Sequence, residues 1–375
     1  MTMELEDINR ICNKLNIEGE VIGVSIMSSG HINSTFKIDV LQDKKLKSYI
    51  VQKINTYVFK KPDELMQNIL NVTEFIGNNS NNSKQMSTLK FLKGENGKGY
   101  VELQDGFFRA YEFVPNSETY DITENLDIIY ETGFAFGEFQ KKLQGFDSGK
   151  LFETIPDFHN TPNRFVWLEQ AVNEDAAGRR KEVEDVIKEY LDLRAPAEEM
   201  YYQYLRGDLP ARVTHNDTKC NNVLFNTLTK KHICVIDLDT VMPGLVGYDF
   251  GDGVRSITNS STEDERDLSK VNINLDKFKS YTKGFLDGAG DALTKHEIET
   301  LPLGAITMTV ECGARFLTDY LNGDKYFKIG YPKHNLDRAR CQLALAQDMI
   351  RKSSQMQEIV DSCSKNAKQK ENGEN

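Results

Sequence analysis

The stretch THNDTKCNNVLF places four side chains that can do chemistry at fixed intervals: His215, Asp217, Lys219 and Asn222. Fifteen residues after Asn222, the apolar run ICVI ends in Asp237. A carboxylate such as Asp217 can receive or orient the proton of an acceptor hydroxyl, and an ammonium such as Lys219 can follow a moving negative charge. An uncharged amide and a second carboxylate, Asn222 and Asp237, can hold Mg²⁺ against nucleotide phosphates. These residue types predict phosphoryl transfer, in which the protein mainly aligns the reactants and neutralises charge.

The order and spacing match a kinase catalytic loop and its downstream metal-binding aspartate. Asp237 and Asp239 after an apolar strand also fit two other patterns, the nucleophile motif of haloacid-dehalogenase-type phosphatases and the Asp-x-Asp metal clamp of some glycosyltransferases. The phosphatase motif stands early in its domain, whereas here it follows more than two hundred residues. Neither alternative uses HNDTKCNN, so we favour the kinase interpretation. Asp239 is expected to assist the metal or to orient the loop.

The elements that must position these residues fall into two groups. Three strand-like segments (EVIGVSIMS, STFKIDVL, KSYIVQKI), a helix (KPDELMQNILNVTEFIG) and a hairpin (GYVELQDGFFRAYEFV) come first. Long amphipathic helices follow from about Leu126, and NVLFNTLTKKHICVID predicts a second, short β element. We therefore expect an α+β, protein-kinase-like two-lobed fold. It has a small antiparallel-sheet N-terminal lobe (residues 1–115), a larger, mainly helical C-terminal lobe (116–362) and a disordered-looking tail (363–375).

The segment SSGHINSTFKI predicts a strand-turn-strand element that covers the nucleotide phosphates. Gly30 stands in its turn, where the absence of a Cβ lets backbone amides approach a phosphate closely. A single glycine in a hairpin turn is usually only a turn, so this interpretation depends on the catalytic loop. YEFVPNS lies where a hinge would offer backbone groups to adenine. The nucleotide contacts expected from the turn are Gly30, His31, Asn33 and Ser34.

The third strand supplies the expected phosphate-binding lysine. By alternation Lys53 and Val51 point to one face, as a phosphate lysine and an adenine-pocket residue should, and Gln52 points to the other. Glu64 or Glu74 of the next helix could pair with Lys53. The alternative that Lys53 is an ordinary solvated charge stays open.

These motifs resemble the aminoglycoside phosphotransferase and choline kinase-like superfamily, and most closely its N-acetylhexosamine 1-kinase branch. The branch is indicated by SGHIN, QKINTYVFKKPDELMQNI, THNDTKCNNVLF, CVIDLDTVMPGLVGYDFGD and RFLTDYLNGDKYF, which together with HNLDRARCQ extend from Ser29 to Gln342. The resemblance implies phosphorylation of the anomeric hydroxyl of N-acetylglucosamine or N-acetylgalactosamine, with ATP as co-substrate and Mg²⁺ as cofactor. Ser256 stands where relatives can carry a bulkier side chain, which leaves the sugar preference open.

The family's roles carry over to Asp217 as the catalytic base and to Arg315 and Tyr326 as sugar-side residues. They also carry over to Asn222 and Asp237 as metal-site residues. From the residues alone, Arg315 would be assigned an ordinary ion pair with Glu311, four positions earlier on a helix. Asp252 could contribute to the substrate site, and we interpret Asp249 as a structural anchor beneath the catalytic loop.

The composition restricts the partners. The formal net charge is −11, and neutralising nucleic-acid phosphates needs a basic surface, so no nucleic-acid partner is expected. No apolar run is long enough to cross a bilayer, and the first residues carry no secretion signal, so no membrane partner is expected. Six scattered cysteines without ligand spacing predict reduced thiols and a cytoplasmic protein.

Two alternatives in function remain. An aminoglycoside, choline or homoserine could be the acceptor instead, and the acidic chain slightly favours a cationic acceptor, whereas the motif strings favour the sugar. A pseudokinase-like binding module is the other alternative. Such a module would have lost Asp217, Asn222 or Asp237, and all three are present.

Overall fold

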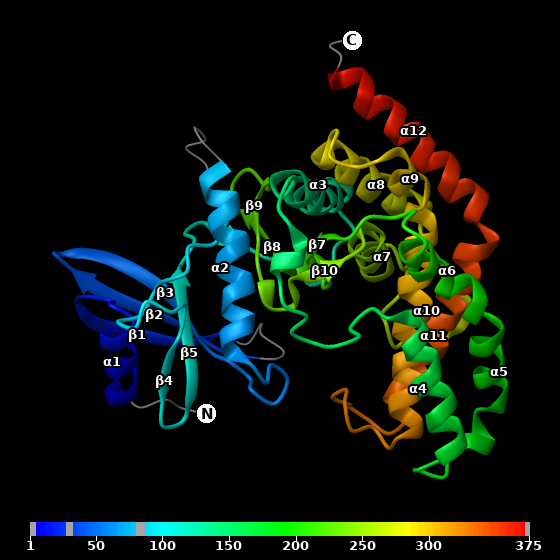
Figure 1. The fold of residues 1–375 in the computed structure, drawn as a ribbon, viewed down its shortest axis with the longest axis horizontal. Coiled ribbons are helices and arrows are strands. Elements are labelled where there is room, and N and C mark those ends of the chain that lie inside the picture. The colour runs from blue at the N-terminus through cyan, green and yellow to red at the C-terminus, as the bar shows by residue number, and fades with distance from the viewer. Residues whose placement is uncertain (1–4, 28–32, 80–87, 372–375) are drawn as a thin grey trace.

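The computed structural model describes residues 5–27, 33–79 and 88–371. Its N-terminal sheet, with two helices, lies at one end of the molecule in Figure 1, and a larger, mostly helical body lies at the other. The predicted α+β, protein-kinase-like architecture is confirmed, because a small antiparallel sheet precedes a mainly helical remainder.

The N-terminal lobe is built on an antiparallel sheet with the strand order β1-β2-β3-β5-β4. Strands β4 and β5 form the expected hairpin, in which Leu103 pairs with Gly106, so the turn falls on Gln104 and Asp105. Alternate apolar side chains of β2, β3 and β5 pack against α1 on one face of the sheet, and the other face looks toward the C-terminal lobe. The elements are α1 (Leu5–Lys14), β1 (Glu20–Met27), β2 (Ser34–Gln42), β3 (Lys45–Lys53), β4 (Val101–Leu103) and β5 (Gly106–Glu112).

Helix α2 (Pro62–Asn79) links the two lobes. Its first residue is proline, whose fixed φ and missing N–H suit the first helical turn. The buried Asn68 amide donates to the carbonyls of Phe152 at 2.8 Å and Val241 at 3.0 Å, and its oxygen accepts from Phe152 N at 2.9 Å. A buried amide with these bonds satisfied holds the helix at one position over the C-terminal lobe.

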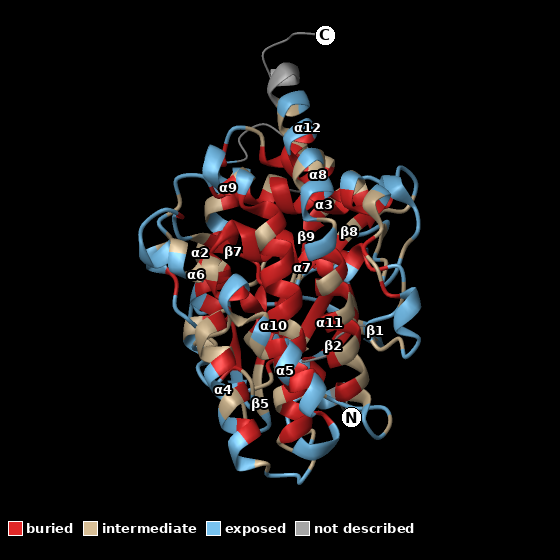
Figure 2. Ribbon diagram, turned by 90° about the vertical axis from the view of Figure 1, so that its right-hand side faces the viewer, coloured by how far each residue is buried: buried red, intermediate tan, exposed pale blue. Residues whose placement is uncertain are grey.

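The C-terminal lobe is organised around α10 (Leu301–Leu321), which is buried on most of its surface and lies in the middle of the red core in Figure 2. In the same lobe, α3 (Leu126–Lys142) and α8 (Leu275–Ala289) pack backbone to backbone. A Cβ on Gly137 would lie 2.0 Å from Phe285 O, so larger residues cannot fit there. The other helices are α4 (Thr161–Glu174), α5 (Glu184–Asp192), α6 (Arg194–Leu205), α7 (Val246–Ile257), α9 (Lys295–Glu299), α11 (His334–Arg351) and α12 (Ser353–Glu371).

Short strands complete this lobe. The predicted second β element is confirmed as β8 (Val223–Asn226) and β9 (His232–Val235), which β6 (Ser117–Glu118) extends. The pair β7 (Arg212–Thr214) and β10 (Met242–Gly244) was not predicted, because strands of three residues carry no detectable alternation. The segment expected to be disordered from residue 363 is instead helical as far as Glu371, since α12 continues through it. All six cysteines are free thiols, as expected.

An ionic cluster joins β9 to α3. His232 Nδ1 lies 2.7 Å from Glu131 Oε2, and His232 Nε2 lies 3.4 Å from Glu138 Oε2. Burial alone would lower the pKa of His232, but the hydrogen bonds to both glutamates outweigh it and raise the pKa. His232 is therefore favoured in its charged form in the folded protein.

The sign of this shift gives a prediction for stability. The contribution of His232 to the free energy of unfolding is complete below its unfolded pKa of about 6.5 and is lost as the pH rises through the folded value. We expect His232→Gln to cost about 2 kcal/mol at pH 6 and less at pH 9, as measured by urea unfolding. The exposed His296→Gln serves as control. A cost that does not change with pH would contradict the assignment.

Candidate active site

Three predicted site residues meet in the loop between β7 and β8. Asn222 Nδ2 donates hydrogen bonds to Asp217 Oδ2 at 3.0 Å and to the main-chain oxygen of Asp217 at 2.8 Å. Lys219 Nζ lies 2.8 Å from Asp217 Oδ1, and this negative charge raises the pKa of Lys219 above its usual range. The side chain of Asp217 keeps 28% of its surface exposed, so an acceptor molecule can reach it.

The loop is held from beneath by two carboxylates of α7. Asp249 is fully buried and accepts hydrogen bonds from the backbone amides of His215 at 2.9 Å and Asn216 at 2.8 Å. Burial raises the pKa of Asp249 to about 6. Asp252 accepts from the backbone amide of Thr218 at 2.9 Å. Asn216 has a φ of 64°, a left-handed conformation, and these bonds stabilise it. The anchoring role expected for Asp249 is confirmed.

Removing this anchor should disturb both stability and turnover. Asp249→Ala leaves two buried backbone amides without an acceptor, so we expect a loss of about 3 kcal/mol in the free energy of unfolding. We also expect a fall of about 10²-fold in kcat, because Asp217 follows directly in the loop. Asp249→Asn keeps one carbonyl oxygen as acceptor and should lose less of both. Equal effects of the two variants on stability and kcat would contradict this role.

Asp237 completes the group at the end of β9. Its backbone lies in the left-handed region, with φ 57° and ψ 59°, a conformation that costs a non-glycine residue about 1–3 kcal/mol and is found often at functional sites. Burial, together with the charges of Asp239 and Asp217, raises the pKa of Asp237 to about 7. The Asp237 side chain is exposed and lines a cleft, and a carboxylate that neighbours other carboxylates is a place where a cation would be stabilised.

The donors fit a magnesium ion. The Asn222 side chain donates both of its hydrogen bonds from its amide nitrogen. Within the described residues its amide oxygen has no partner. Mg²⁺ commonly takes one or two protein ligands and completes its shell with phosphate oxygens and water. In the described part of the chain, no three His, Cys, Asp or Glu side chains form a metal cluster. Asn222 and Asp237 carry oxygen atoms of the kind that Mg²⁺ binds, and both line one cleft.

Asp239 belongs to a contact between the lobes. It forms a buried ion pair with Arg109 of β5 and accepts a hydrogen bond from Asn33 Nδ2 at 2.5 Å. Arg109 also donates from Nε to Gln52 Oε1 at 2.9 Å. Both oxygens of Asp239 thus contact residues of the N-terminal lobe. These contacts hold the two lobes together, and both expected roles of Asp239, assisting the metal or orienting the loop, stay predictions.

The expected face of β3 was wrong. A cleft of about 370 Å³ between the lobes is lined from β3 by Ile50 and Gln52, together with Asp237 and Asn222. Lys53 lies on the opposite face, where its Nζ is 3.2 Å from Asp105 Oδ2. The structure therefore does not bring Lys53 into the cleft, nor does it pair Lys53 with Glu64 or Glu74, which contact Lys61 and Lys93.

Of the other residues expected to contact the nucleotide, the structure describes Asn33 and Ser34. Gly30 and His31 lie outside the described residues. Asn33 is buried at the contact between the lobes, where its Oδ1 accepts from Asn55 N at 2.9 Å while its amide donates to Asp239. Ser34 begins β2 and is exposed. Among the described residues of this turn, Asn33 is the one that bonds the C-terminal lobe.

The expected sugar-side residues share a pocket that Asp217 does not line. Arg315 and Tyr326 line a pocket of about 180 Å³ on α10, and the Arg315 guanidinium stacks over Phe158 and Phe327 at 5.1 and 5.6 Å. Glu311 does not pair with Arg315 and instead bonds His159, at 2.7 Å. The intrahelical ion pair that spacing alone indicates is therefore absent from the described contacts.

Asp252 is occupied by the protein itself. Its Oδ1 lies 2.7 Å from Arg255 Nη2, while its Oδ2 anchors the loop. Burial would raise the pKa of Asp252, but Arg255 and Lys219 hold it below its usual range. It positions the loop beside Lys219.

A model of the phosphotransferase enzyme family matches residues 24–270, which is well over half of the chain. The chain belongs to this family.

Solved structures agree with the fold. An aminoglycoside phosphotransferase from Alicyclobacillus acidocaldarius matches with 12% identity and a TM-score of 0.58, over 98% of this chain and 97% of the other. A choline kinase from Cryptosporidium parvum matches with 14% identity and a TM-score of 0.58, over 96% and 99%. A spectinomycin phosphotransferase solved with ADP and spectinomycin matches with 13% identity and a TM-score of 0.54, over 92% and 100%.

The protein is thus a small-molecule phosphotransferase with the aminoglycoside phosphotransferase and choline kinase fold. None of the helices within residues 5–27, 33–79 and 88–371 combines the length and apolar character needed to cross a bilayer. Two residues that line the cleft between the lobes, Arg109 and Gln52, were not among the predicted site residues. Arg109 stands in FFRAYEF, where a basic residue amid apolar neighbours on a strand was the available signal.

Proposed function

We propose that this phosphotransferase is an N-acetylhexosamine 1-kinase, which transfers the γ-phosphoryl group of ATP to the anomeric C1 hydroxyl of N-acetylglucosamine or N-acetylgalactosamine. The observation that carries the catalytic part is the contact of Asn222 with Asp217. It sets a proton acceptor and a metal-site amide in one loop, beside the carboxylate of Asp237. The acceptor is proposed from the resemblance of the long motif strings.

ATP would occupy the cleft between the lobes. The volume of about 370 Å³ lies within the range of small-molecule sites. Apolar side chains of both lobes line it, among them Ile50, Leu224 and Ile236, and these suit the adenine ring. Val114 and Ser117, from the segment proposed as the hinge, border the same cleft. The phosphates would then point toward Asn222 and Asp237.

Asn222 and Asp237 would hold the magnesium ion. When bound, the ion neutralises charge on the nucleotide phosphates. Asp237 would give up any proton it carries, since its pKa of about 7 leaves it partly protonated near neutral pH. Asn222 keeps its amide nitrogen on Asp217 and offers its oxygen to the ion, so the same residue connects metal and base.

Asp217 then orients the acceptor. The C1 hydroxyl oxygen forms a bond to the γ-phosphorus, the bond from that phosphorus to the β–γ bridging oxygen breaks, and ADP leaves with the electron pair. The hydroxyl proton passes to Asp217. An anomeric hydroxyl is more acidic than an ordinary alcohol, so a carboxylate that accepts the proton late is sufficient. Lys219, paired with Asp217, stabilises the transferred negative charge.

The sugar would lie on the C-terminal lobe. Arg315 and Tyr326 are carried over from the resemblance as the residues that face it, and both line the pocket on α10. Phe327, which stacks with Arg315 and lines the same pocket, supplies an aromatic wall of the kind that sugar rings pack against. Asp252 contributes through the loop that it anchors.

A cationic acceptor is the second candidate. The net charge of −11 favours a cation such as an aminoglycoside or choline over a neutral sugar. Homoserine is a zwitterion and is an alternative acceptor without this support. Structural neighbours named as aminoglycoside phosphotransferases and choline kinases share the fold. These acceptors would use the same Asp217, Asn222 and Asp237, so only the acceptor pocket distinguishes them.

The test offers ATP, Mg²⁺ and a panel of N-acetylhexosamines, aminoglycosides, choline and homoserine, and it follows ADP release. For each active sugar, reducing ends are titrated, because phosphorylation at C1 removes the reducing end while phosphorylation at C6 keeps it. The matched control is the 1-O-methyl N-acetylhexosamine, whose C1 oxygen is blocked. We expect ADP release with the free sugar and none with the methyl glycoside. Turnover of choline or an aminoglycoside alone would replace the sugar assignment with the second candidate.

A further inference from the structure

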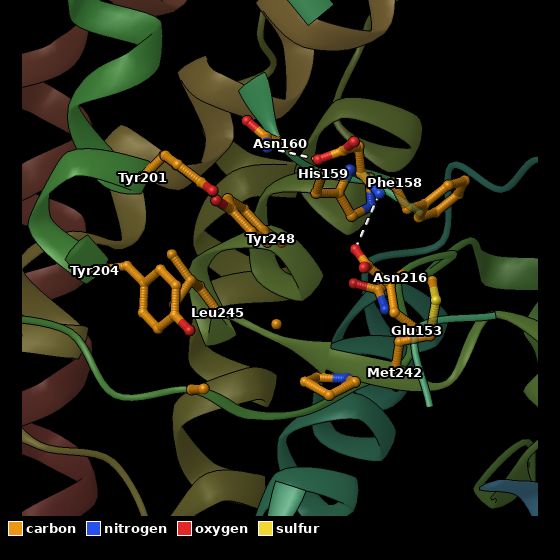
Figure 3. A pocket seen from close by; sticks show the side chains of 14 residues that line it. Glu153, Phe158, His159, Asn160, Tyr201, Tyr204, Asn216, Met242, Leu245 and Tyr248 are labelled. Carbon is orange, nitrogen blue, oxygen red and sulfur yellow. Dashed lines mark hydrogen bonds between the residues drawn. The ribbon is translucent and has the colours of Figure 1, made fainter. Parts of the chain in front are cut away.

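A second cavity lies behind the catalytic loop, on the side of Asn216. Its volume is about 340 Å³, and its walls come from residues 153–160, α6, β10 and the start of α7. It shares no lining residue with the nucleotide cleft or with the pocket that contains Lys219. Figure 3 shows Tyr201, Tyr204 and Tyr248 on one side of this space and Glu153 and Asn216 on the other. We call it the tyrosine pocket.

The tyrosine pocket is acidic. Glu153 and Asp157 line it, and neither forms an ion pair within the described part of the chain. Their contacts are with neutral donors: Asp157 N donates to Glu153 Oε1 at 2.9 Å, and Asn160 Nδ2 donates to Asp157 Oδ1 at 2.6 Å. Among the described residues, no lysine or arginine lines the cavity, and the one basic side chain that does, His159, bonds Glu311. An anionic ligand is therefore disfavoured.

Aromatic rings form much of the remaining wall. The rings of Tyr201 and Tyr204 lie 6.2 Å apart, and those of His159 and Tyr248 lie 5.3 Å apart. Phe158 continues the second group, 4.5 Å from His159. Ring faces attract a cation that approaches within about 6 Å, and the attraction grows when the site excludes water.

Two buried polar atoms of this wall lack a partner. The hydroxyl of Tyr248 has no hydrogen bond within the described residues, although only 4% of the residue is exposed. His159 Nε2 is likewise buried and unbonded there, while its other ring nitrogen contacts Glu311. Native proteins seldom leave such groups unpaired, so each indicates a missing partner. Both side chains line the cavity.

We propose that the tyrosine pocket is a binding site for a small primary ammonium ion, separate from both the nucleotide and the acceptor of the phosphotransferase reaction. The ammonium charge is balanced by Glu153 and Asp157 and faces the rings of Tyr201 and Tyr204. Its N–H groups supply the hydrogen bond that the oxygen of Tyr248 lacks. A neutral alcohol of the same size would leave the two carboxylates uncompensated, and a carboxylate ligand would be repelled.

The probe is n-butylammonium, which has no hydroxyl group and so cannot be an acceptor alcohol. Its binding is measured by calorimetry without nucleotide, against 1-butanol and butyrate as matched neutral and anionic ligands. Glu153→Gln removes one charge from an exposed position, Tyr204→Ala removes one ring, and Tyr248→Phe removes only the hydroxyl. Tyr202→Ala is the control for the ring, since Tyr202 lies on the same helix and does not line the cavity.

We expect saturable binding of n-butylammonium that is weakened at least about fivefold in Glu153→Gln and Tyr204→Ala, by less in Tyr248→Phe, and not in Tyr202→Ala. Neither butanol nor butyrate should bind, and a non-hydrolysable ATP analogue should not displace the probe. No saturable binding, or equal binding by all four variants, would overturn the proposal. Displacement by ATP would overturn it as well. These outcomes do not depend on any acceptor being phosphorylated. A failure of this binding proposal can therefore be distinguished from a failure of the proposed kinase activity.

Discussion

Asp217→Asn should lower kcat by about 10³-fold while the protein stays folded and still binds ATP. The new amide keeps an oxygen that can accept the hydrogen bond from Asn222, but this oxygen cannot take the proton of the acceptor hydroxyl. The substitution also removes the negative charge that pairs with Lys219. Turnover is measured by ADP release at saturating acceptor, and ATP binding by calorimetry.

Asp208→Asn is the matched control, because it makes the same chemical change at an exposed position after α6. It should leave kcat unchanged. A kcat for Asp217→Asn within about threefold of the unaltered enzyme would remove the base assignment, whatever the acceptor proves to be.

Asp237→Asn should have the second largest effect, with opposite consequences for activity and stability. Activity should fall by about 10²-fold or more, because the charged donor that faces the metal is lost. Stability without metal should not fall, because a carboxylate that is repelled by Asp239 and Asp217 is replaced by a neutral amide.

The pH dependence gives a further check on Asp237. Because the folded pKa of about 7 lies above the unfolded value near 3.8, the stabilising contribution of this group is complete at low pH and is lost as the pH rises toward 7. In metal-free protein, the stability advantage of Asp237→Asn should therefore grow between pH 4 and pH 7, as measured by thermal unfolding. An advantage that shrinks as the pH rises would show that Asp237 is not destabilised by burial and like charge.

The catalytic loop could be predicted from sequence because its geometry is local. Asp217, Lys219 and Asn222 are separated by two and three residues, and a short loop leaves such side chains few ways to avoid one another. The anchor Asp249 was recognisable for a related reason, since an acidic residue among apolar neighbours on a buried helix needs nearby donors to satisfy it.

The face of β3 could not be predicted in the same way. Ile50 and Val51 are both buried, one toward the cleft and the other toward α1. Alternation of apolar and polar residues then no longer distinguishes the two faces, and an error of one residue exchanges Gln52 for Lys53.

The contact between Arg109 and Asp239 was beyond sequence reasoning for a different reason. The two residues lie on different lobes and come together only when the sheet docks over β9. Ion pairs between distant segments leave no periodic or spacing signal. The expected ion pair between Glu311 and Arg315 failed for the same reason. Glu311 instead bonds His159, which lies on a loop far away in the sequence, so the helical spacing of Glu311 and Arg315 carried no information.

The measurement that tests the account most directly is phosphorus NMR of the enzyme with ATP, Mg²⁺ and N-acetylglucosamine or N-acetylgalactosamine. We predict that the γ-phosphate signal decays while a phosphomonoester signal grows, split into a doublet by the single proton on C1. A triplet, from the two protons on C6, or the appearance of inorganic phosphate alone would contradict transfer to the anomeric hydroxyl at Asp217.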